Sequence, residues 1–169
     1  MMIKRIFPCL VVASIVFASC VKNNKCAYSN SSVTAPDTEI QNLKDSLFAH
    51  SITTAILNPA GFYYKIDSAG LGTAVTNLCS TVSVSYRGTY FNGVTFDSTA
   101  ANQLATFQLW RVIVGWQKGL PLINKGGEVN LYIPPSLAYG PNPVTDNSGN
   151  VLVPGNSYLE FDIHLVDVQ

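Results

Sequence analysis

The sequence predicts an α+β fold in which an antiparallel sheet is combined with short helices. Residues 81–90 and 159–165 alternate apolar with polar residues, which is typical of strands that have one buried and one solvated face. Residues 62–66 and 128–133 are further strand candidates. Residues 112–119 instead repeat apolar residues at helical spacing, which predicts a short, largely buried helix.

The N-terminus has the features of an export signal. Lys4 and Arg5 precede an apolar run over residues 6–17, which is too short to span a bilayer as a mature helix. We therefore expect a signal peptide over residues 1–19. The ending Phe17-Ala18-Ser19-Cys20 resembles a bacterial lipobox, which implies that Cys20 carries a lipid; a plain secretory signal is the alternative.

The mature chain divides into a tether, a helical extension and one domain. Residues 20–36 are mostly polar, which favours a flexible tether. Apolar residues at helical spacing predict a helix over 37–51, within an N-terminal extension that spans 37–58. Residues 61–169 suffice for a single compact domain. Within it, residues 134–156 are rich in Pro, Gly and Asn, and we expect a long loop without a core element.

The lipid and the charge of the chain bear on its location and partners. Acyl chains on Cys20 would anchor the protein to the cell envelope through a membrane. Residues 21–25 contain no acidic residue, which favours an anchor in the outer membrane that faces the periplasm. The chain has ten basic and ten acidic residues and no Lys/Arg cluster after the signal, so nucleic acid is not an expected partner.

The cysteines leave two alternatives open. Cys9 lies in the signal peptide and Cys20 is assigned to the lipid, so Cys26 and Cys79 remain. An exported protein can keep a Cys26–Cys79 disulfide. Two free thiols are the simpler expectation, because Cys26 lies in the polar tether and sequence does not show proximity. Neither cysteine has metal-ligand partners nearby, so no metal site is expected.

Residues suited to nucleophilic or acid–base catalysis are scarce. The chain has two histidines, His50 and His164, and both are expected to be solvated. The sequence shows no Ser/His/Asp arrangement and no pair of acidic residues in a catalytic context. Any catalytic activity is therefore not expected to depend on general acid–base chemistry.

Five short segments are the most informative motifs. They are 84–89 (Val-Ser-Tyr-Arg-Gly-Thr), 93–98 (Gly-Val-Thr-Phe-Asp-Ser), 112–116 (Val-Ile-Val-Gly-Trp), 137–140 (Leu-Ala-Tyr-Gly) and 159–165 (Leu-Glu-Phe-Asp-Ile-His-Leu). In order and spacing they resemble the signature blocks of FK506-binding-type (FKBP) peptidyl-prolyl cis-trans isomerases. The resemblance covers roughly residues 61–169.

The resemblance implies a fold and a ligand pocket. In the family, five or six antiparallel strands curl around one short helix, and the pocket lies between the helix and the sheet. Trp116 matches the pocket floor, on which a proline ring rests, while Asp97 and Tyr139 match its polar contacts. The other pocket positions implied are Tyr86, Phe96, Phe107, Val112, Ile113, Leu159 and Phe161. The backbone N–H of Ile113 is implied as a donor to a substrate carbonyl.

The implied activity is cis-trans isomerisation of X-Pro bonds in exported or envelope proteins. Its substrates are proline-containing polypeptides, and FK506-like macrolides are candidate ligands. Rotation breaks no covalent bond, but it loses amide resonance against a barrier of about 18–20 kcal/mol. An apolar pocket that favours the twisted amide needs no metal, cofactor or nucleophile.

Two other functions stay open at this point. The first is a chaperone or partner-binding module with the same fold and little turnover, and two departures from the family pattern, Ala105 and Trp110, favour it. The second is a structural surface lipoprotein in which the aromatic residues form an ordinary core. In either case a monomer is favoured, because a single amphipathic helix more often covers its own domain than forms a dimer.

Overall fold

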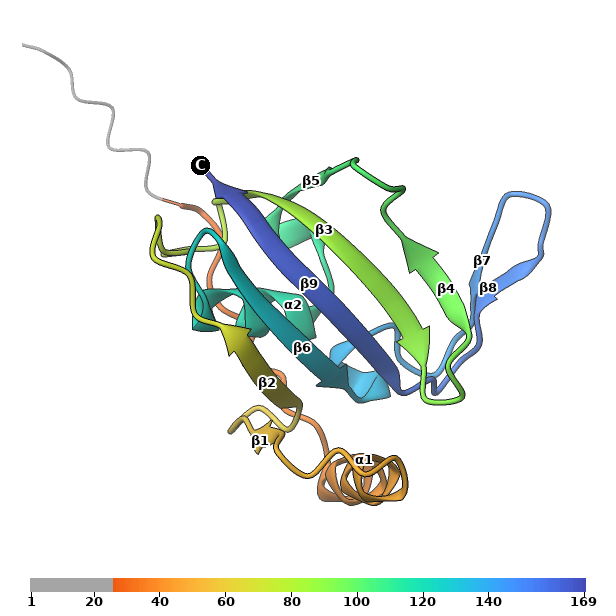
Figure 1. Ribbon diagram of the computed structural model, residues 1–169. Helices are drawn as coiled ribbons and strands as arrows, with labels where there is room; N and C mark the ends of the chain where they lie inside the picture. The colour runs from red at the N-terminus through yellow and green to blue at the C-terminus, as the bar shows by residue number, and fades with distance from the viewer. Residues whose placement is uncertain (1–25) are drawn as a thin grey trace, which may run out of the picture.

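The computed structural model describes residues 26–169 (Figure 1). The predicted signal peptide, the lipid on Cys20 and the first residues of the tether lie outside the described residues. Within residues 26–169, no helix is long and apolar enough to cross a membrane. The predicted division of the mature chain into tether, extension and domain stays a prediction, and the contacts of each part are described below.

An antiparallel sheet forms the body of the molecule and confirms the predicted fold class. Across it, the strands run in the order β1-β2-β6-β9-β3-β4, and β5 pairs with the other half of the β3 edge. Within residues 26–169 this sheet has seven strands instead of the expected five or six, because β4 and β5 pair with separate halves of β3 and the two-residue strand β1 is added at the other edge. The strands are β1 (Ile56–Leu57), β2 (Tyr63–Ser68), β3 (Thr81–Tyr90), β4 (Thr95–Ser98), β5 (Ala105–Gln108), β6 (Gly127–Ile133) and β9 (Leu159–Val168).

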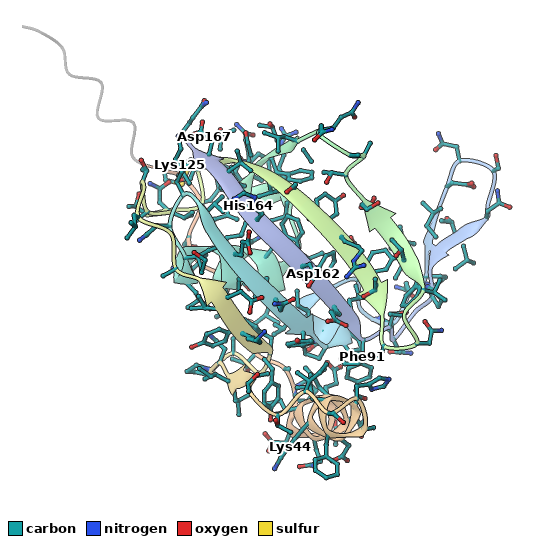
Figure 2. All side chains as sticks on the ribbon, viewed as in Figure 1. Lys44, Phe91, Lys125, Asp162, His164 and Asp167 are labelled. Carbon is teal, nitrogen blue, oxygen red and sulfur yellow. A yellow bond between two sulfur atoms is a disulfide. The ribbon has the colours of Figure 1, made fainter. Side chains whose placement is uncertain are left out.

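The two predicted alternating strands, β3 and β9, lie side by side at the centre of the sheet. Along β9 the buried residues are Leu159, Phe161, Ile163 and Leu165, and the residues between them are partly exposed. The period of two therefore places one face of the sheet against the core and the other against solvent. Figure 2 shows Asp162 and His164 on this solvated face, in agreement with the expectation for His164.

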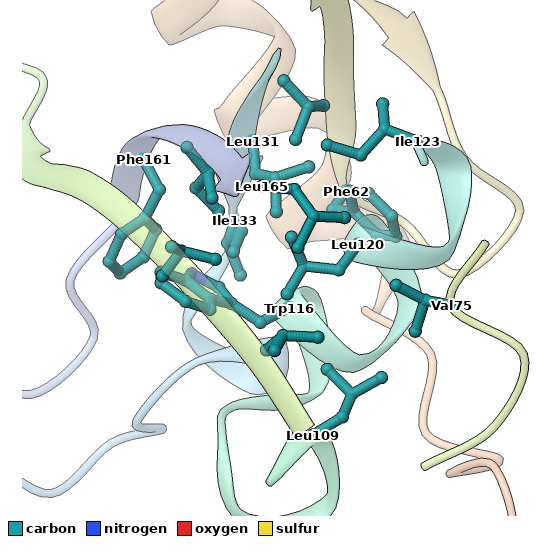
Figure 3. Packing of buried hydrophobic residues seen from close by; sticks show 14 of the residues in the cluster. Phe62, Val75, Leu109, Trp116, Leu120, Ile123, Leu131, Ile133, Phe161 and Leu165 are labelled. Atoms are coloured by element: carbon teal, nitrogen blue, oxygen red, sulfur yellow. The ribbon is translucent and has the colours of Figure 1, made fainter. Parts of the chain in front are cut away.

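Helix α2 (Val114–Gly119) covers the buried face at unusually close range. Gly115 and Gly119 both face β6, and a Cβ at either position would lie 2.5 Å from a side-chain carbon of Ile133 or Leu131, respectively. Two glycines four residues apart thus remove the side chains that would hold the helix away from the sheet. Figure 3 shows Trp116, from the same helix, directed into the core beside Phe161.

The predicted helix over 112–119 is wrong in its first turn. Val112 and Ile113 are extended, with ψ angles of 171° and 152°, and the helix begins only at Val114. A 3₁₀ turn precedes these two residues (η1, Leu109–Arg111), and a second one (η2, Leu120–Leu122) follows the helix. β-branched residues lose side-chain freedom in a helix, so their helical spacing was a weaker signal than their preference for extended backbone.

The N-terminal extension packs on its own domain. Helix α1 (Asp37–Ala49) buries Leu43 and Leu47 against Tyr132 of β6. A second contact comes from Glu39, whose Oε2 accepts hydrogen bonds from the backbone N–H (3.0 Å) and hydroxyl (2.7 Å) of Ser136. The amphipathic pattern therefore reflects contact within the chain. In Figure 1 the helix lies at the end of the sheet where β3 turns into β4.

The expectation of two free thiols is wrong, and residues 26–36 of the predicted tether contact the domain. Cys26 and Cys79 form a disulfide, with their Cα atoms 5.5 Å apart. After Cys26, the Tyr28 ring stacks on Trp110, Ser31 accepts a hydrogen bond from Lys118 Nζ (2.7 Å), and Ala35 is buried. The polar composition of this segment does not predict these contacts, because they depend on single residues such as Tyr28 and Ala35 or on the backbone carbonyl of Ser31.

The long connection over 134–156 also contains more structure than predicted. It opens with a 3₁₀ turn (η3, Pro135–Leu137) and then forms a hairpin of β7 (Val144–Thr145) and β8 (Val151–Val153). Leu137 and Val153 are buried in the core, so the segment does contribute core residues. Within the turn, Asp146 accepts hydrogen bonds from the backbone of Ser148 and Asn150, which favours a tight hairpin over a loop.

Removal of the disulfide should destabilise the domain. The bond joins residues 53 apart in sequence, and closing a loop of this length restricts the unfolded chain. We therefore expect Cys26→Ser with Cys79→Ser to lower the free energy of unfolding by about 2–4 kcal/mol. Urea denaturation followed by circular dichroism measures the difference. The comparison requires wild-type protein in which the Cys26–Cys79 disulfide is fully formed. The prediction would be contradicted if this protein and the variant had equal denaturation midpoints.

The stability of the domain should also depend on the charge of Glu160. Burial beside Tyr132, and secondarily the charge of Asp162, raise the pKa of Glu160 in the folded state. A raised pKa means that the uncharged form is favoured on folding, so this stabilisation is present at low pH and is lost as pH rises through the folded-state pKa. Glu160→Gln should therefore raise the melting temperature at pH 7, and the gain should vanish below about pH 4.

The exposed Glu128 on the neighbouring strand supplies the control for this measurement. Glu128→Gln should change the melting temperature little at either pH, since surface substitutions are usually within about 0.5 kcal/mol. A gain for Glu160→Gln that is the same at pH 4 and pH 7 would show that charge is not the cause.

Candidate functional site

A pocket of about 230 Å³ opens between α2 and the buried face of the sheet. Its walls come from β3, β5, β9, the segment before α2 and the loop after η3. The lining residues are Tyr86, Asp97, Phe107, Arg111, Val112, Ile113, Trp116, Tyr139 and Phe161. Five of these nine side chains are aromatic and two are aliphatic, which is the composition of a site for an apolar ring.

Trp116 forms the centre of this pocket. Three aromatic rings stand almost perpendicular to its indole, at interplanar angles of 86–88°. They belong to Tyr86, Phe107 and Phe161, with ring centroids 5.2, 5.9 and 5.3 Å from the indole. Edge-to-face contacts of this kind are favourable, so the four rings hold one another in place. The indole therefore offers a rigid apolar surface at the bottom of the pocket.

Two N–H groups of lining residues have no hydrogen-bond partner within the described residues. The Trp116 side chain is 4% exposed, and its Nε1 is buried without a hydrogen-bond partner within the described residues. The backbone N–H of Ile113 likewise forms no hydrogen bond within residues 26–169. A buried donor without a partner costs free energy. A ligand with a carbonyl group could remove part of that cost.

The polar side of the pocket is formed by Tyr86, Asp97 and Tyr139. The Tyr86 hydroxyl donates a hydrogen bond of 2.6 Å to Asp97 Oδ2. Burial, and then the contact with Asp97, raise the pKa of Tyr86 well above its usual value, so the phenol stays protonated. Burial and the charge of Asp97 also raise the pKa of Tyr139. Asp97 itself is exposed and keeps further acceptor capacity for a ligand.

The backbone before α2 is held by a side chain that the sequence did not single out. Gln117 Nε2 donates hydrogen bonds to the carbonyl oxygens of Val112 (2.8 Å) and Trp110 (3.3 Å). These bonds fix the extended Val112–Ile113 segment whose side chains line the pocket. Since glutamine on a short helix is common, no motif could have identified this role.

A glycine on β3 makes room for the aromatic wall. A Cβ on Gly88 would lie 2.7 Å from Phe96 Cζ and 2.9 Å from Phe161 Cε1. The absence of a side chain lets both rings pack across the strand, where their centroids are 5.6 Å apart. Phe96 therefore supports Phe161 from behind and does not itself line the cavity.

Most of the residues predicted for the pocket come together. Eight of the ten line it: Tyr86, Asp97, Phe107, Val112, Ile113, Trp116, Tyr139 and Phe161. Phe96 lies in the second layer, as described above. The assignment of Leu159 to substrate binding is wrong in geometry, because its side chain is 0% exposed and belongs to the core. Period-two alternation does not reveal this difference, because Leu159 and Phe161 lie on the same buried face of β9 and only Phe161 lines the pocket.

Arg111 is the lining residue that the sequence analysis missed. It lies immediately before Val112, at the end of η1, and its guanidinium carbon is 4.6 Å from the centroid of the Trp110 ring. Its position next to the Val-Ile pair was the only available signal. Trp110, noted as a departure from the family pattern, does not line the cavity and instead supports this arginine.

Other hollows are larger but differ in chemistry. One of about 340 Å³ lies on the solvated face of the sheet and is lined by polar and charged side chains. Two of its charged groups already pair with each other, since Arg87 binds Asp162 at 2.7 Å. The aromatic pocket is therefore the better candidate site for a small apolar group.

Comparison with known families supports the assignment. The model of the FKBP-type peptidyl-prolyl cis-trans isomerases matches residues 73–166, which is more than half of the chain. The chain belongs to this family. The FKBP match includes every element that lines the pocket, whereas helix α1 and the disulfide-bonded Cys26 precede it.

Individual FKBP relatives match the same region. The chain is 41% identical over 110 residues to FkpA of Escherichia coli K12. The matched region covers 64% of this chain and 38% of that protein. It is 42% identical over 115 residues to the outer membrane protein MIP of Legionella longbeachae, covering 68% and 47%. The chain thus spans less than half the length of these relatives.

Solved structures agree on the fold. The crystal structure of Escherichia coli FkpA superposes with a TM-score of 0.65 at 35% identity, over 79% of this chain and 60% of that one. The crystal structure of AtFKBP13 gives a TM-score of 0.61 at 30% identity, over 68% and 98%. Both have the FKBP arrangement of an antiparallel sheet with a short helix.

Proposed function

We propose that the protein is a peptidyl-prolyl cis-trans isomerase that binds X-Pro segments of polypeptides in the aromatic pocket. The observation that carries this proposal is the Trp116 indole, held by three perpendicular rings at the bottom of a pocket in an FKBP-type domain. A proline ring is apolar and nearly flat, so it can stack on the indole and be enclosed by the surrounding aromatic rings.

Binding needs polar contacts in addition to the ring. The Ile113 N–H is free within the described residues and belongs to a residue that lines the pocket, so it can donate to a carbonyl of the substrate. Tyr139 can donate through its protonated hydroxyl, and Asp97 can accept from a substrate N–H. Hydrogen bonds to these groups would orient the peptide across the mouth of the pocket while the proline ring lies on the indole.

Catalysis follows from unequal binding of the planar and twisted amides. A planar amide is polarised by resonance, whereas the twisted amide has lost that resonance and is less polar. An apolar enclosure therefore favours the twisted form, and hydrogen bonds that fit only this form add to the difference. A hundred-thousand-fold acceleration would need about 7 kcal/mol of such preference. The chain's own side chains suffice for this mechanism.

The proposal extends to the location and role of the protein. A signal peptide over residues 1–19 and a lipid on Cys20 would place the domain on the cell envelope. The proposed site is the periplasmic side of the outer membrane. The name of one relative, outer membrane protein MIP, supports an envelope location. The substrates would then be exported proteins that fold there, and FK506-like macrolides would compete for the pocket.

An FKBP-fold chaperone with little turnover is the second candidate function. The hairpin of β7 and β8 extends away from the body of the domain (Figure 1), and it exposes about half of the surface of Val151 and Leu152. Exposed apolar residues on a projecting hairpin could bind unfolded segments independently of the pocket. This function predicts suppression of aggregation that does not require Trp116 or Asp97.

Asp97→Ala should reduce isomerase activity without loss of the fold. Asp97 is exposed, and its side chain accepts a hydrogen bond from the Tyr86 hydroxyl. Loss of one charged hydrogen-bond acceptor at the site should lower kcat/KM about tenfold, which corresponds to about 1.4 kcal/mol. A protease-coupled assay of a short X-Pro peptide measures the rate, and added FK506 should inhibit the wild-type protein.

Asp162→Ala is the matched control. It removes another exposed carboxylate, on the opposite face of the sheet, and should leave kcat/KM unchanged if the pocket is the active site. Circular dichroism would establish that both variants are folded. If the wild-type protein leaves the uncatalysed rate unchanged with several residues before proline, the isomerase proposal fails and the chaperone becomes the function to test.

A further inference from the structure

The mouth of the pocket carries one cation, Arg111, whose position is set by two aromatic rings. Its guanidinium carbon lies 4.6 Å from the Trp110 ring centroid. Trp110 in turn stacks on Tyr28, with centroids 4.2 Å apart and planes 10° from parallel. A guanidinium over an indole is favoured by the ring's quadrupole, so the stack restricts the arginine to one region of the pocket rim.

The stack is fixed at both ends by bonds within the chain. Tyr28 lies two residues after Cys26, which is joined to Cys79 by the disulfide. At the other end, Gln117 Nε2 donates a hydrogen bond to the Trp110 carbonyl oxygen. The N-terminal segment, predicted as a flexible tether, therefore helps to position a residue that lines the pocket.

Arg111 has no anionic partner within residues 26–169. The three salt bridges in this part of the chain involve Lys65, Arg87 and Lys125. Asp97, the carboxylate that also lines the pocket, receives its hydrogen bond from Tyr86 and forms no salt bridge with Arg111. The positive charge at the rim is consequently available to a ligand.

We propose that Arg111 is a specificity-determining residue that favours substrates with an acidic side chain directly beside the proline. The inference rests on the proposed isomerase function and adds a substrate class to it. A proline ring seated on Trp116 places its neighbouring residues at the rim, and Arg111 is the cation that lines this rim. A carboxylate there gains a partner, whereas a lysine side chain is repelled.

The expected preference is modest, because Arg111 is exposed. Ion pairs between exposed groups are weak, so a Glu side chain should raise kcat/KM over Gln by about threefold. The effect should appear mainly in KM, since the ion pair takes no part in the bond rotation and stabilises the complexes of planar and twisted amides alike. Salt should reduce it, because exposed charges are screened within about 10 Å at 0.1 M ionic strength.

Peptides that differ in one side chain test this proposal. One series carries Glu, Gln or Lys before proline, and a second series carries them after it. For the wild-type protein we expect a Glu/Gln ratio of kcat/KM of about three in one of the series at low salt, falling toward one in about 0.5 M NaCl. Arg111→Gln should bring the ratio to about one, and Arg111→Glu should invert it.

Arg111→Lys is the conservative variant and should keep a ratio above one. The ratio for each variant compares two peptides with one protein, so a general loss of activity or stability cancels. The proposal is overturned if Arg111→Gln keeps the wild-type ratio in both series, or if salt leaves the ratio unchanged.

Failure of the isomerase function would be recognised separately, because then no peptide of either series would be accelerated. In that case the dissociation constants of the Glu-Pro and Gln-Pro peptides, measured by NMR titration of the Trp116 indole N–H, provide the same ratio. A ratio near one for wild-type protein in both series would still overturn the role of Arg111.

Discussion

The close contact between Gly115 and Gly119 on α2 and the side chains of Ile133 and Leu131 on β6 sets the depth of the whole site. Because Gly115 and Gly119 present no side chain to β6, the helix lies close to the sheet and Trp116 reaches under β3 and β9. There it meets Tyr86 of β3 and Phe161 of β9, and Gly88 of β3, which pairs with Phe161, leaves room for the Phe161 ring. Missing side chains at three positions thus allow four aromatic rings to converge.

Convergence of rings also explains the polarity of the pocket. Rings that support one another edge to face leave only the face of the indole for a ligand, and the polar atoms are displaced to the rim, where Asp97, Tyr139 and Arg111 lie. The interior can then discriminate between amides by their polarity, while the rim discriminates between peptides by their side chains. The two tasks are performed by different residues.

The sequence predicted the sheet and most of the residues that line the pocket, but not the contacts that attach the N-terminal segment to the domain. Alternation in β3 and β9 fixes which residues are buried, because a strand has only two faces. The family blocks supplied the roles of Trp116 and Asp97, which no periodicity contains. By contrast, the Cys26–Cys79 bond and the Tyr28–Trp110 stack join segments about 50 to 80 residues apart. Such contacts depend on the completed fold and have no local signal, so the composition of residues 26–36 does not predict how this segment is attached to the domain.

The disulfide also determines how far the domain can stand from a membrane. If Cys20 carries the proposed lipid, only six residue steps separate it from Cys26, and even a fully extended chain covers about 20 Å over that distance. A tether that ended at Pro36 would allow about 50 Å. Cys79 lies just before β3, at the end of the sheet where Thr81 pairs with the C-terminal Gln169. Gly88 and the pocket lie about 20 Å further along the strand. The short connection would therefore keep that end of the sheet within about 20 Å of the lipid-bearing residue, and the pocket within about 40 Å of it.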